Sequence, residues 1–172
     1  MSSFKLKVVL LGSPDSQKSK LMQKFIKNRF AANYKLTVGV DILTKDVEFK
    51  PQEVATLSIW DVGGQQRYEF IRSTFYKGAA GAIIVFNLNR KTSLTQVASW
   101  IANLRKYAGP KIPICLIGNN IYSMEKDQGI EQEIQHLANN EDMIYIETSP
   151  SSGNYIEEMF VGLTTKIIES RG

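Results

Sequence analysis

Cysteine, histidine and long apolar runs are scarce in this sequence of 172 residues, and each shortage excludes a class of protein. Its one cysteine, Cys115, cannot close an internal disulfide, which fits a reducing compartment such as the cytosol. Its one histidine, His136, excludes a zinc site built from cysteines and histidines and argues against a Ser-His-Asp triad. The longest apolar run, residues 81–88, is far shorter than the roughly 18 residues that a membrane-spanning helix needs.

Dense charge of one sign is missing as well. The formal net charge of +4 is mild and no basic run appears, which argues against a nucleic-acid partner. The N-terminus meets a strand pattern almost at once, so no signal peptide is expected. The composition is that of a globular protein, and the absence of linkers, repeats and low-complexity segments predicts one domain over residues 1–172.

The sequence does contain segments with the hydrophobic pattern of strands, which alternate with segments that have the hydrophobic spacing of helices. Continuous apolar runs are typical of strands that are buried on both faces of a parallel sheet, and other apolar residues recur at helical spacing. A loose alternation on either side of Pro51-Gln52 predicts an antiparallel hairpin. The predicted strands are residues 5–11, 40–49, 54–60, 82–86, 112–117 and 143–146. The helical spacing covers residues 21–30, 94–107, 130–137 and 156–167.

This order of elements predicts an α/β fold with three layers. We expect a six-stranded, mostly parallel sheet with one antiparallel edge strand and about five helices on its two faces. Ligands of such sheets bind at the carboxyl ends of the strands. Those ends are residues 12–19, 61–65, 87–90, 118–122 and 148–152.

A phosphate-loop pattern follows the first predicted strand. Residues 12–19 read GSPDSQKS and match G-x-x-x-x-G-K-[ST] except at the second glycine, which is Gln17. In such a loop backbone N–H groups surround phosphate oxygens. Lys18 would add a point charge, and Ser19 would give its hydroxyl to Mg²⁺.

Two further residues of this loop work against phosphate. Asp15 places a carboxylate beside the anion unless its side chain turns outward, and Pro14 removes one N–H donor. A plain turn that caps the following helix through Asp15 or Ser16 explains the loop about as well. Later residues favour the phosphate interpretation. Asp61 can reach a metal held by Ser19 through a water, and Thr37 could complete the metal shell.

Taken together, the motifs resemble the Ras superfamily of small GTPases, and most closely its Rab branch. Residues 37–41, TVGVD, look like the Rab first switch, and residues 57–68, LSIWDVGGQQRY, look like the second switch around "WDTAGQERF". Residues 75–81, FYKGAAG, resemble "YYRGAxG", and residues 147–149, ETS, resemble the start of "ETSAK". The resemblance covers residues 4 to about 169 and implies a P-loop NTPase-like fold.

The resemblance also implies roles for single residues. Lys18 would bind the β- and γ-phosphates, Asp61 would hold a metal-bound water, and Gly64 would donate its N–H to the γ-phosphate. Gln65 would be the catalytic residue that orients the attacking water. The implied metal ligands are Ser19, Thr37 and Asp61. The implied nucleotide-binding positions are Gly12, Asp15, Ser16, Gln17, Lys18, Ser19, Lys20, Thr37, Gly64, Asn119, Asn120, Tyr122, Ser149 and Pro150.

The guanine-recognition end departs from the family pattern. Where the family has N-K-x-D, this sequence has Asn119-Asn120-Ile121-Tyr122. Asn120 is too short to lie along a base, and Tyr122 cannot accept the two hydrogen bonds that the family aspartate takes from guanine. Pro150 stands where the family alanine donates its N–H, and Ser149 survives. Losing these bonds should cost about 4 kcal/mol, or roughly three orders of magnitude in affinity.

Two main functions and a weaker third stay open on this sequence. The favoured hypothesis is a degenerate, pseudo-GTPase-like regulatory protein with weakened or non-guanine-selective nucleotide binding. It would recruit effector or regulator proteins through residues 30–45 and 62–77. The alternative is an active GTP-hydrolysing switch in membrane trafficking or signalling, and a third option is an NTPase for another base. The cofactor would be Mg²⁺ with GTP or GDP if nucleotide is bound, and none otherwise.

The prediction about membrane association depends on the end of the sequence. Rab proteins carry prenylated cysteines in a C-terminal tail, and no cysteine lies near Gly172. Either a tail was removed or the protein carries no lipid anchor. We therefore expect a cytoplasmic protein that reaches membranes, if at all, through partners or a missing tail. The sequence leaves the oligomeric state open.

Overall fold

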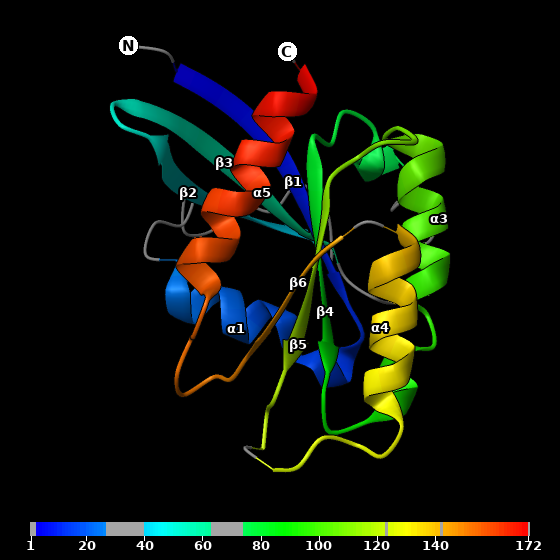
Figure 1. Ribbon diagram of the computed structural model, residues 1–172. Coiled ribbons are helices and arrows are strands. Elements are labelled where there is room, and N and C mark those ends of the chain that lie inside the picture. Colours follow the sequence, from blue (N-terminus) through cyan, green and yellow to red (C-terminus); the bar gives the residue numbers. More distant parts are fainter. Residues whose placement is uncertain (1–2, 27–39, 63–73, 123, 142, 172) are drawn as a thin grey trace.

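The computed structural model describes residues 3–26, 40–62, 74–122, 124–141 and 143–171. It contains a six-stranded sheet in the order β2-β3-β1-β4-β5-β6 (Figure 1). All neighbouring pairs are parallel except β2 and β3, so the predicted sheet with one antiparallel edge strand is confirmed. The strands are β1 (Ser3–Gly12), β2 (Val40–Lys50), β3 (Glu53–Val62), β4 (Gly81–Asn87), β5 (Ile114–Asn119) and β6 (Ile144–Thr148).

Helices cover both faces of the sheet, as the alternating pattern predicts. In Figure 1, α1 and α5 lie on one side of the sheet, and α3 and α4 lie on the other. Two separate apolar clusters fill the space between these layers. The α-helices are α1 (Lys18–Phe25), α3 (Val97–Tyr107), α4 (Ile130–Glu141) and α5 (Ile156–Arg171), and residues 74–76 are helical as well. Among the described residues, the short 3-10 helices are η1 (Pro14–Ser16) and η3 (Lys91–Leu94).

The continuous apolar runs have the burial that a central parallel strand requires. Every residue of β4 and of β5 is buried. Because both faces of these strands meet a helical layer, the sequence shows no polar alternation there. β3, by contrast, alternates between buried and partly exposed residues along much of its length. The two kinds of pattern therefore report the position of each strand in the sheet.

Some element boundaries differ from the predictions. Leu94 belongs to η3 rather than to the helix that follows, because the Ser93 and Thr95 N–H groups bond to carbonyls three residues earlier. β5 begins at Ile114 and not at Ile112, because Ile112 is bonded into a turn with Gly109. The helix predicted over residues 21–30 begins at Lys18 and ends at Phe25, because Ile26 has an extended backbone, and Phe30 lies outside the described residues.

Candidate functional site

The carboxyl ends of the parallel strands meet at one edge of the sheet, where the sequence places its candidate site. Lys18 after β1 bonds to Asp61 at the end of β3. The Asn119 side-chain amide at the end of β5 donates to the Ser16 carbonyl oxygen over 3.0 Å. The Asn120 N–H donates to the carbonyl oxygen of Thr148, at the end of β6, over 2.8 Å. Segments far apart in the sequence therefore form one polar site, as the α/β prediction requires.

The loop between β1 and α1 keeps a backbone shape that glycine serves best. Gln17 has φ 54° and ψ 38°, in the left-handed region, immediately before α1 begins. Gln17 is also the position of the second glycine in the phosphate-loop pattern. A left-handed conformation costs a residue with a side chain roughly 1–2 kcal/mol. The loop therefore has the left-handed turn at Gln17 without the glycine that would adopt this conformation without strain.

We expect Gln17→Gly to raise the free energy of unfolding by about 0.5–1 kcal/mol. Relief of the left-handed strain outweighs the extra entropy that glycine gives the unfolded chain, roughly 0.4–1 kcal/mol. Urea unfolding followed by far-ultraviolet circular dichroism measures the change. Gln17→Ala is the matched control, because it removes the side chain but keeps the strain, and it should bring no gain. A lower midpoint for Gln17→Gly would contradict this account of the loop.

Lys18, the candidate phosphate-binding cation, lies in a buried ion pair with Asp61. The two side chains are only 9% and 5% exposed, and the Lys18 ammonium also reaches the Ser19 hydroxyl at 3.5 Å. One ammonium is thus held between a carboxylate and a hydroxyl from two different segments. A polyphosphate that recruits Lys18 has to compete with Asp61 for the same cation.

The same residues determine whether Mg²⁺ fits the site. A hydroxyl and a carboxylate are the hard oxygen ligands that Mg²⁺ takes together with phosphates and waters, so Ser19 and Asp61 fit in kind. Both oxygens contact the Lys18 ammonium, which gives them one common neighbour. Within the described ranges no group of three or more His, Cys, Asp and Glu side chains could hold a metal. If nucleotide is bound, Ser19 and Asp61 would hold an ion that neutralises phosphate charge.

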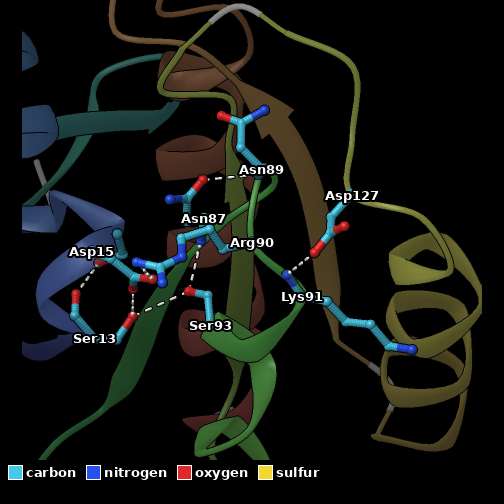
Figure 2. A network of polar contacts seen from close by, with 9 residues as sticks. Ser13, Asp15, Asn87, Asn89, Arg90, Lys91, Ser93 and Asp127 are labelled. Carbon is cyan, nitrogen blue, oxygen red and sulfur yellow. Dashed lines mark hydrogen bonds and ion pairs between the residues drawn. The ribbon is translucent and has the colours of Figure 1, made fainter.

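The Asp15 side chain belongs to a chain of polar contacts that includes Ser13, Ser93 and Arg90 (Figure 2). Its carboxylate accepts a hydrogen bond from the Ser13 hydroxyl and lies 3.8 Å from the Arg90 guanidinium. The Ser13 and Ser93 hydroxyl oxygens are 3.1 Å apart, and the Ser93 hydroxyl accepts the Asn87 N–H over 2.8 Å. Asp15 thereby ties the phosphate loop to the segment after β4.

Two further donors of the loop, both on Ser16, are engaged in the turn itself. The Ser16 N–H and the Ser16 hydroxyl both donate to the Ser13 carbonyl oxygen, over 3.0 Å and 2.6 Å. Pro14 has no N–H to donate. The Gly12 backbone is closely packed, since a Cβ there would lie 2.6 Å from the Ser16 hydroxyl oxygen and from the Val85 carbonyl oxygen. The loop is therefore held by internal contacts.

At the base end, Asn120 takes part in a local hydrogen-bond network. Its side-chain oxygen accepts from Asn89 over 3.0 Å and from the Met124 N–H over 3.2 Å. Its side-chain nitrogen donates to the Met124 carbonyl oxygen over 2.9 Å. The Tyr122 N–H donates to the Asn89 side-chain oxygen over 3.1 Å, and the Tyr122 side chain is 61% exposed. Asn120 and Asn89 thus fasten the loop after β5 to the loop after β4.

The loop after β6 forms its own turn. The Ser149 hydroxyl lies 2.8 Å from the Ser152 hydroxyl, and the Ser149 carbonyl oxygen accepts the Gly153 N–H over 2.9 Å. The Pro150 carbonyl oxygen accepts a hydrogen bond from the Lys24 ammonium on α1. Pro150 has an acceptor but no backbone donor at the position where the family offers an N–H.

Asn119 differs from its neighbours because part of its side chain has no partner. The residue is fully buried, and its nitrogen donates to Ser16. Its side-chain oxygen has no hydrogen-bond partner among the described residues, and the Thr148 hydroxyl, in the paired position on β6, is in the same condition. A buried acceptor without a donor costs roughly 1–3 kcal/mol. A donor placed against this acceptor would remove that cost.

The structure brings some of the predicted site residues together, and others lie apart or outside the described residues. It brings together the loop residues, Asp61, Asn119, Asn120 and the segment after β6. Lys20 is exposed on the first turn of α1. Thr37, Gly64 and Gln65 lie outside the described residues, so their predicted roles stay predictions.

Several residues of this site were missed by the sequence analysis. They are Lys24, Asn89, Arg90, Ser93 and Asp127, and Figure 2 shows four of them. The Asp127 carboxylate accepts the Lys91 N–H over 2.6 Å and so adds a further link between the segments after β4 and β5. No local sequence pattern identifies such partners, because the two residues of each pair are far apart in sequence. Examples are the pair Ser13 and Ser93 and the pair Lys24 and Pro150. The prediction that residues 87–90 form a strand end includes Asn89 and Arg90, and no prediction indicated the other three residues.

The fold and this site together define an α/β protein of the Ras-like P-loop GTPase class. Its six-stranded mixed sheet, helices on both faces and loop–lysine–serine segment after β1 carry that assignment.

Comparison with known proteins identifies the family within that class. The sequence model of the Ras family matches residues 7–169. "GTP-binding protein ypt3" of Schizosaccharomyces pombe is 34% identical over 94% of this chain and 75% of its own length. "Ras-related protein RABA4c" of Arabidopsis thaliana is 34% identical over 94% and 72%, and "Ras-related protein RGP2" of Oryza sativa subsp. japonica is 32% identical over 96% and 76%. The chain belongs to the Ras family and is Rab-like.

Proposed function

We propose that this Rab-like protein binds nucleotide weakly or without selectivity for guanine, and that it acts by recruiting partner proteins. The observation that carries the proposal is the internal engagement of Asn120. Three hydrogen bonds, one from Asn89 and one each to and from Met124, occupy both acceptor sites of its side-chain oxygen and one of its two N–H donors. A base that approached this position would meet a short side chain already committed to its own loop. Tyr122 and Pro150 likewise offer no bidentate acceptor and no N–H donor.

Contacts at the phosphate end support the same proposal. Lys18 is paired with Asp61, and the Ser16 N–H is bonded to Ser13. Asp15 adds a negative charge to the loop, although its contact with Arg90 offsets part of that charge. Binding a polyphosphate would have to break a buried ion pair and compete with internal hydrogen bonds. These costs come in addition to the roughly 4 kcal/mol lost at the base end.

The alternative function is an active GTP-hydrolysing switch, and one observation favours it. The Asn119 side-chain oxygen is a buried acceptor without a partner among the described residues, at a position where the family pattern keeps its asparagine. Lys18, Ser19 and Asp61 also match the family pattern for phosphate and Mg²⁺. Nucleotide binding of some kind is therefore compatible with the phosphate end, and the base end separates the two functions.

Partner recruitment would use the same surface that the family resemblance indicates. Residues 30–45 and 62–77 fall largely outside the described residues, which include only 40–45, 62 and 74–77 of them. Within the described part of the chain no helix is long and apolar enough to cross a membrane. We propose that the protein works in the cytoplasm and reaches membranes through its partners or through a tail.

We expect the purified protein to carry well below one molecule of guanine nucleotide per chain. Denaturing the protein and separating the supernatant by anion exchange measures this content directly. The S. pombe relative that is described as a GTP-binding protein provides a matched positive control in the same buffer with Mg²⁺. A stoichiometric content of GDP or GTP would contradict the proposed function and support the switch.

A further inference from the structure

A groove is lined by residues of α4 and of the edge strand β6. Figure 1 shows α4 on the same face of the sheet as α3. Its volume is about 330 Å³. Ile134, Ala138 and Met143 form its apolar part, and Glu131 and Glu147 contribute carboxylates. None of the residues that line the groove belongs to the candidate nucleotide site. The groove is therefore a separate feature of the fold.

The strand beside the groove has a free edge. β6 is the last strand in the sheet order, so among the described residues it pairs with β5 alone. The Thr148 carbonyl oxygen faces β5, because it accepts the Asn120 N–H. Backbone groups alternate in direction along a strand, so the N–H and C=O groups of Tyr145 and Glu147 point away from β5. The same two residues line the groove with their side chains.

The polar end of the groove already holds a cation. Lys126 bonds to both Glu131 and Glu147, with 2.8 Å between its ammonium and the Glu147 carboxylate. Hydrogen bonds to Glu131 and to Glu147 raise the pKa of Lys126, so it stays charged. Two carboxylates against one ammonium leave a net charge of −1 at this end. A second cation is therefore attracted there.

Tyr145 gives the groove a fixed wall between its apolar and its charged parts. Its ring stacks on Phe86 with centroids 6.2 Å apart, and its hydroxyl donates to the Glu147 carboxylate over 2.7 Å. Burial and the contact with Glu147 raise the pKa of Tyr145, which keeps the hydroxyl a donor. The Glu147 carboxylate is thereby oriented toward Lys126 and the groove.

We propose that β6 and this groove bind an extended basic peptide segment of a partner protein. The segment adds a strand to the free edge of β6 and places an apolar side chain over Ile134 and Ala138. It sets a lysine or arginine against Glu131 and Glu147. Backbone bonding gives such a complex its affinity, and alternate side chains give it specificity. The charge of the groove selects a basic segment over an acidic one.

The test uses the whole chain and a fluorescein-labelled peptide of about nine residues, the length of a strand, that alternates arginine with leucine or valine. Fluorescence anisotropy is expected to show saturable binding. A peptide with proline at alternate positions, which lacks the backbone donors, should bind at least about tenfold more weakly, as should one with glutamate in place of arginine. Equal binding of the proline peptide would overturn strand addition.

Variants of the protein locate the site. Glu131→Gln with Glu147→Gln should weaken binding about tenfold or more, and Ala138→Trp, which fills the groove, should abolish it. Glu158→Gln, an exposed carboxylate on α5, is the matched control and should change nothing. If Ala138→Trp fails to fold, amide NMR shifts of the unchanged protein decide the question. Shifts centred on Tyr145 and Glu147 support the proposal, and shifts elsewhere, or a peptide-independent dimer through β6, overturn it.

Discussion

The triple variant Asn120→Lys, Tyr122→Asp and Pro150→Ala is expected to bind GDP about 1,000-fold more tightly than the parent and to prefer GDP over ATP. The aspartate restores an acceptor for two donors on the guanine edge, the alanine restores a backbone N–H, and the lysine restores a stem along the base. Together these bonds are worth about 4 kcal/mol, which corresponds to that factor. Titration calorimetry with GDP and ATP in the presence of Mg²⁺ measures both numbers.

The structure identifies what this repair disturbs. In the parent, bonds of Asn120 with Asn89 and Met124 hold the loop after β5, and this loop has to open before a base can enter. Replacing Asn120 breaks these bonds. The bond from Lys24 to the Pro150 carbonyl oxygen is unaffected, because alanine keeps that carbonyl. We therefore expect the triple change to give selectivity, and tight binding to need the phosphate loop repaired as well.

A second variant distinguishes the two ends of the site. Asp15→Gly with Gln17→Gly changes a loop that would contact phosphates and not bases, so it should help GDP and ATP equally. If the triple variant bound GDP no better than the parent while this loop variant bound it tightly, the main defect would lie in the loop. Our placement of the defect at the base end would then be wrong.

Lys18→Met is expected to lower the free energy of unfolding by about 3–5 kcal/mol. The substitution leaves the Asp61 carboxylate buried without its cation, and removing one partner of a buried ion pair typically costs this much. Lys18→Met combined with Asp61→Leu should recover most of the loss, because apolar replacement of both partners is often neutral. Urea unfolding of the two variants and the parent measures the coupling.

A half-exposed ion pair supplies the control for this experiment. Lys45 and Glu157 are 2.7 Å apart, with the glutamate side chain 66% exposed, and Lys45→Met should cost no more than about 1 kcal/mol. A loss below about 1 kcal/mol for Lys18→Met as well would contradict the stabilising role of the buried pair. It would also remove the competition for Lys18 as a reason for weak phosphate binding.

The fold could be predicted from the sequence because its signals are local. The apolar run at residues 82–86 gave a buried central strand, and the turn at Pro51-Gln52 gave the antiparallel hairpin. The predicted ends of helices and strands were less accurate where a turn interrupts the hydrophobic periodicity. Leu94 has helical spacing to Val97 and Ile101, yet the i to i+3 bonds of η3 separate it from α3.

The site could be predicted only at the level of its segments. The carboxyl ends of parallel strands had to meet, and Lys18, Asp61 and Asn119 do lie there. The partners of these residues could not be derived, because the contacts between Ser13 and Ser93 and between Asn89 and Asn120 depend on side-chain directions in three dimensions. Spacing in sequence does not encode such directions.

The most direct test of weakened guanine recognition is a titration of the unchanged protein, stripped of any bound nucleotide, with GDP and with ATP in Mg²⁺ buffer. We predict that the two nucleotides bind weakly and that their dissociation constants differ by less than about tenfold, or about 1.4 kcal/mol. A nanomolar dissociation constant for GDP together with rejection of ATP by more than about 100-fold would contradict the account and identify a working guanine-nucleotide switch.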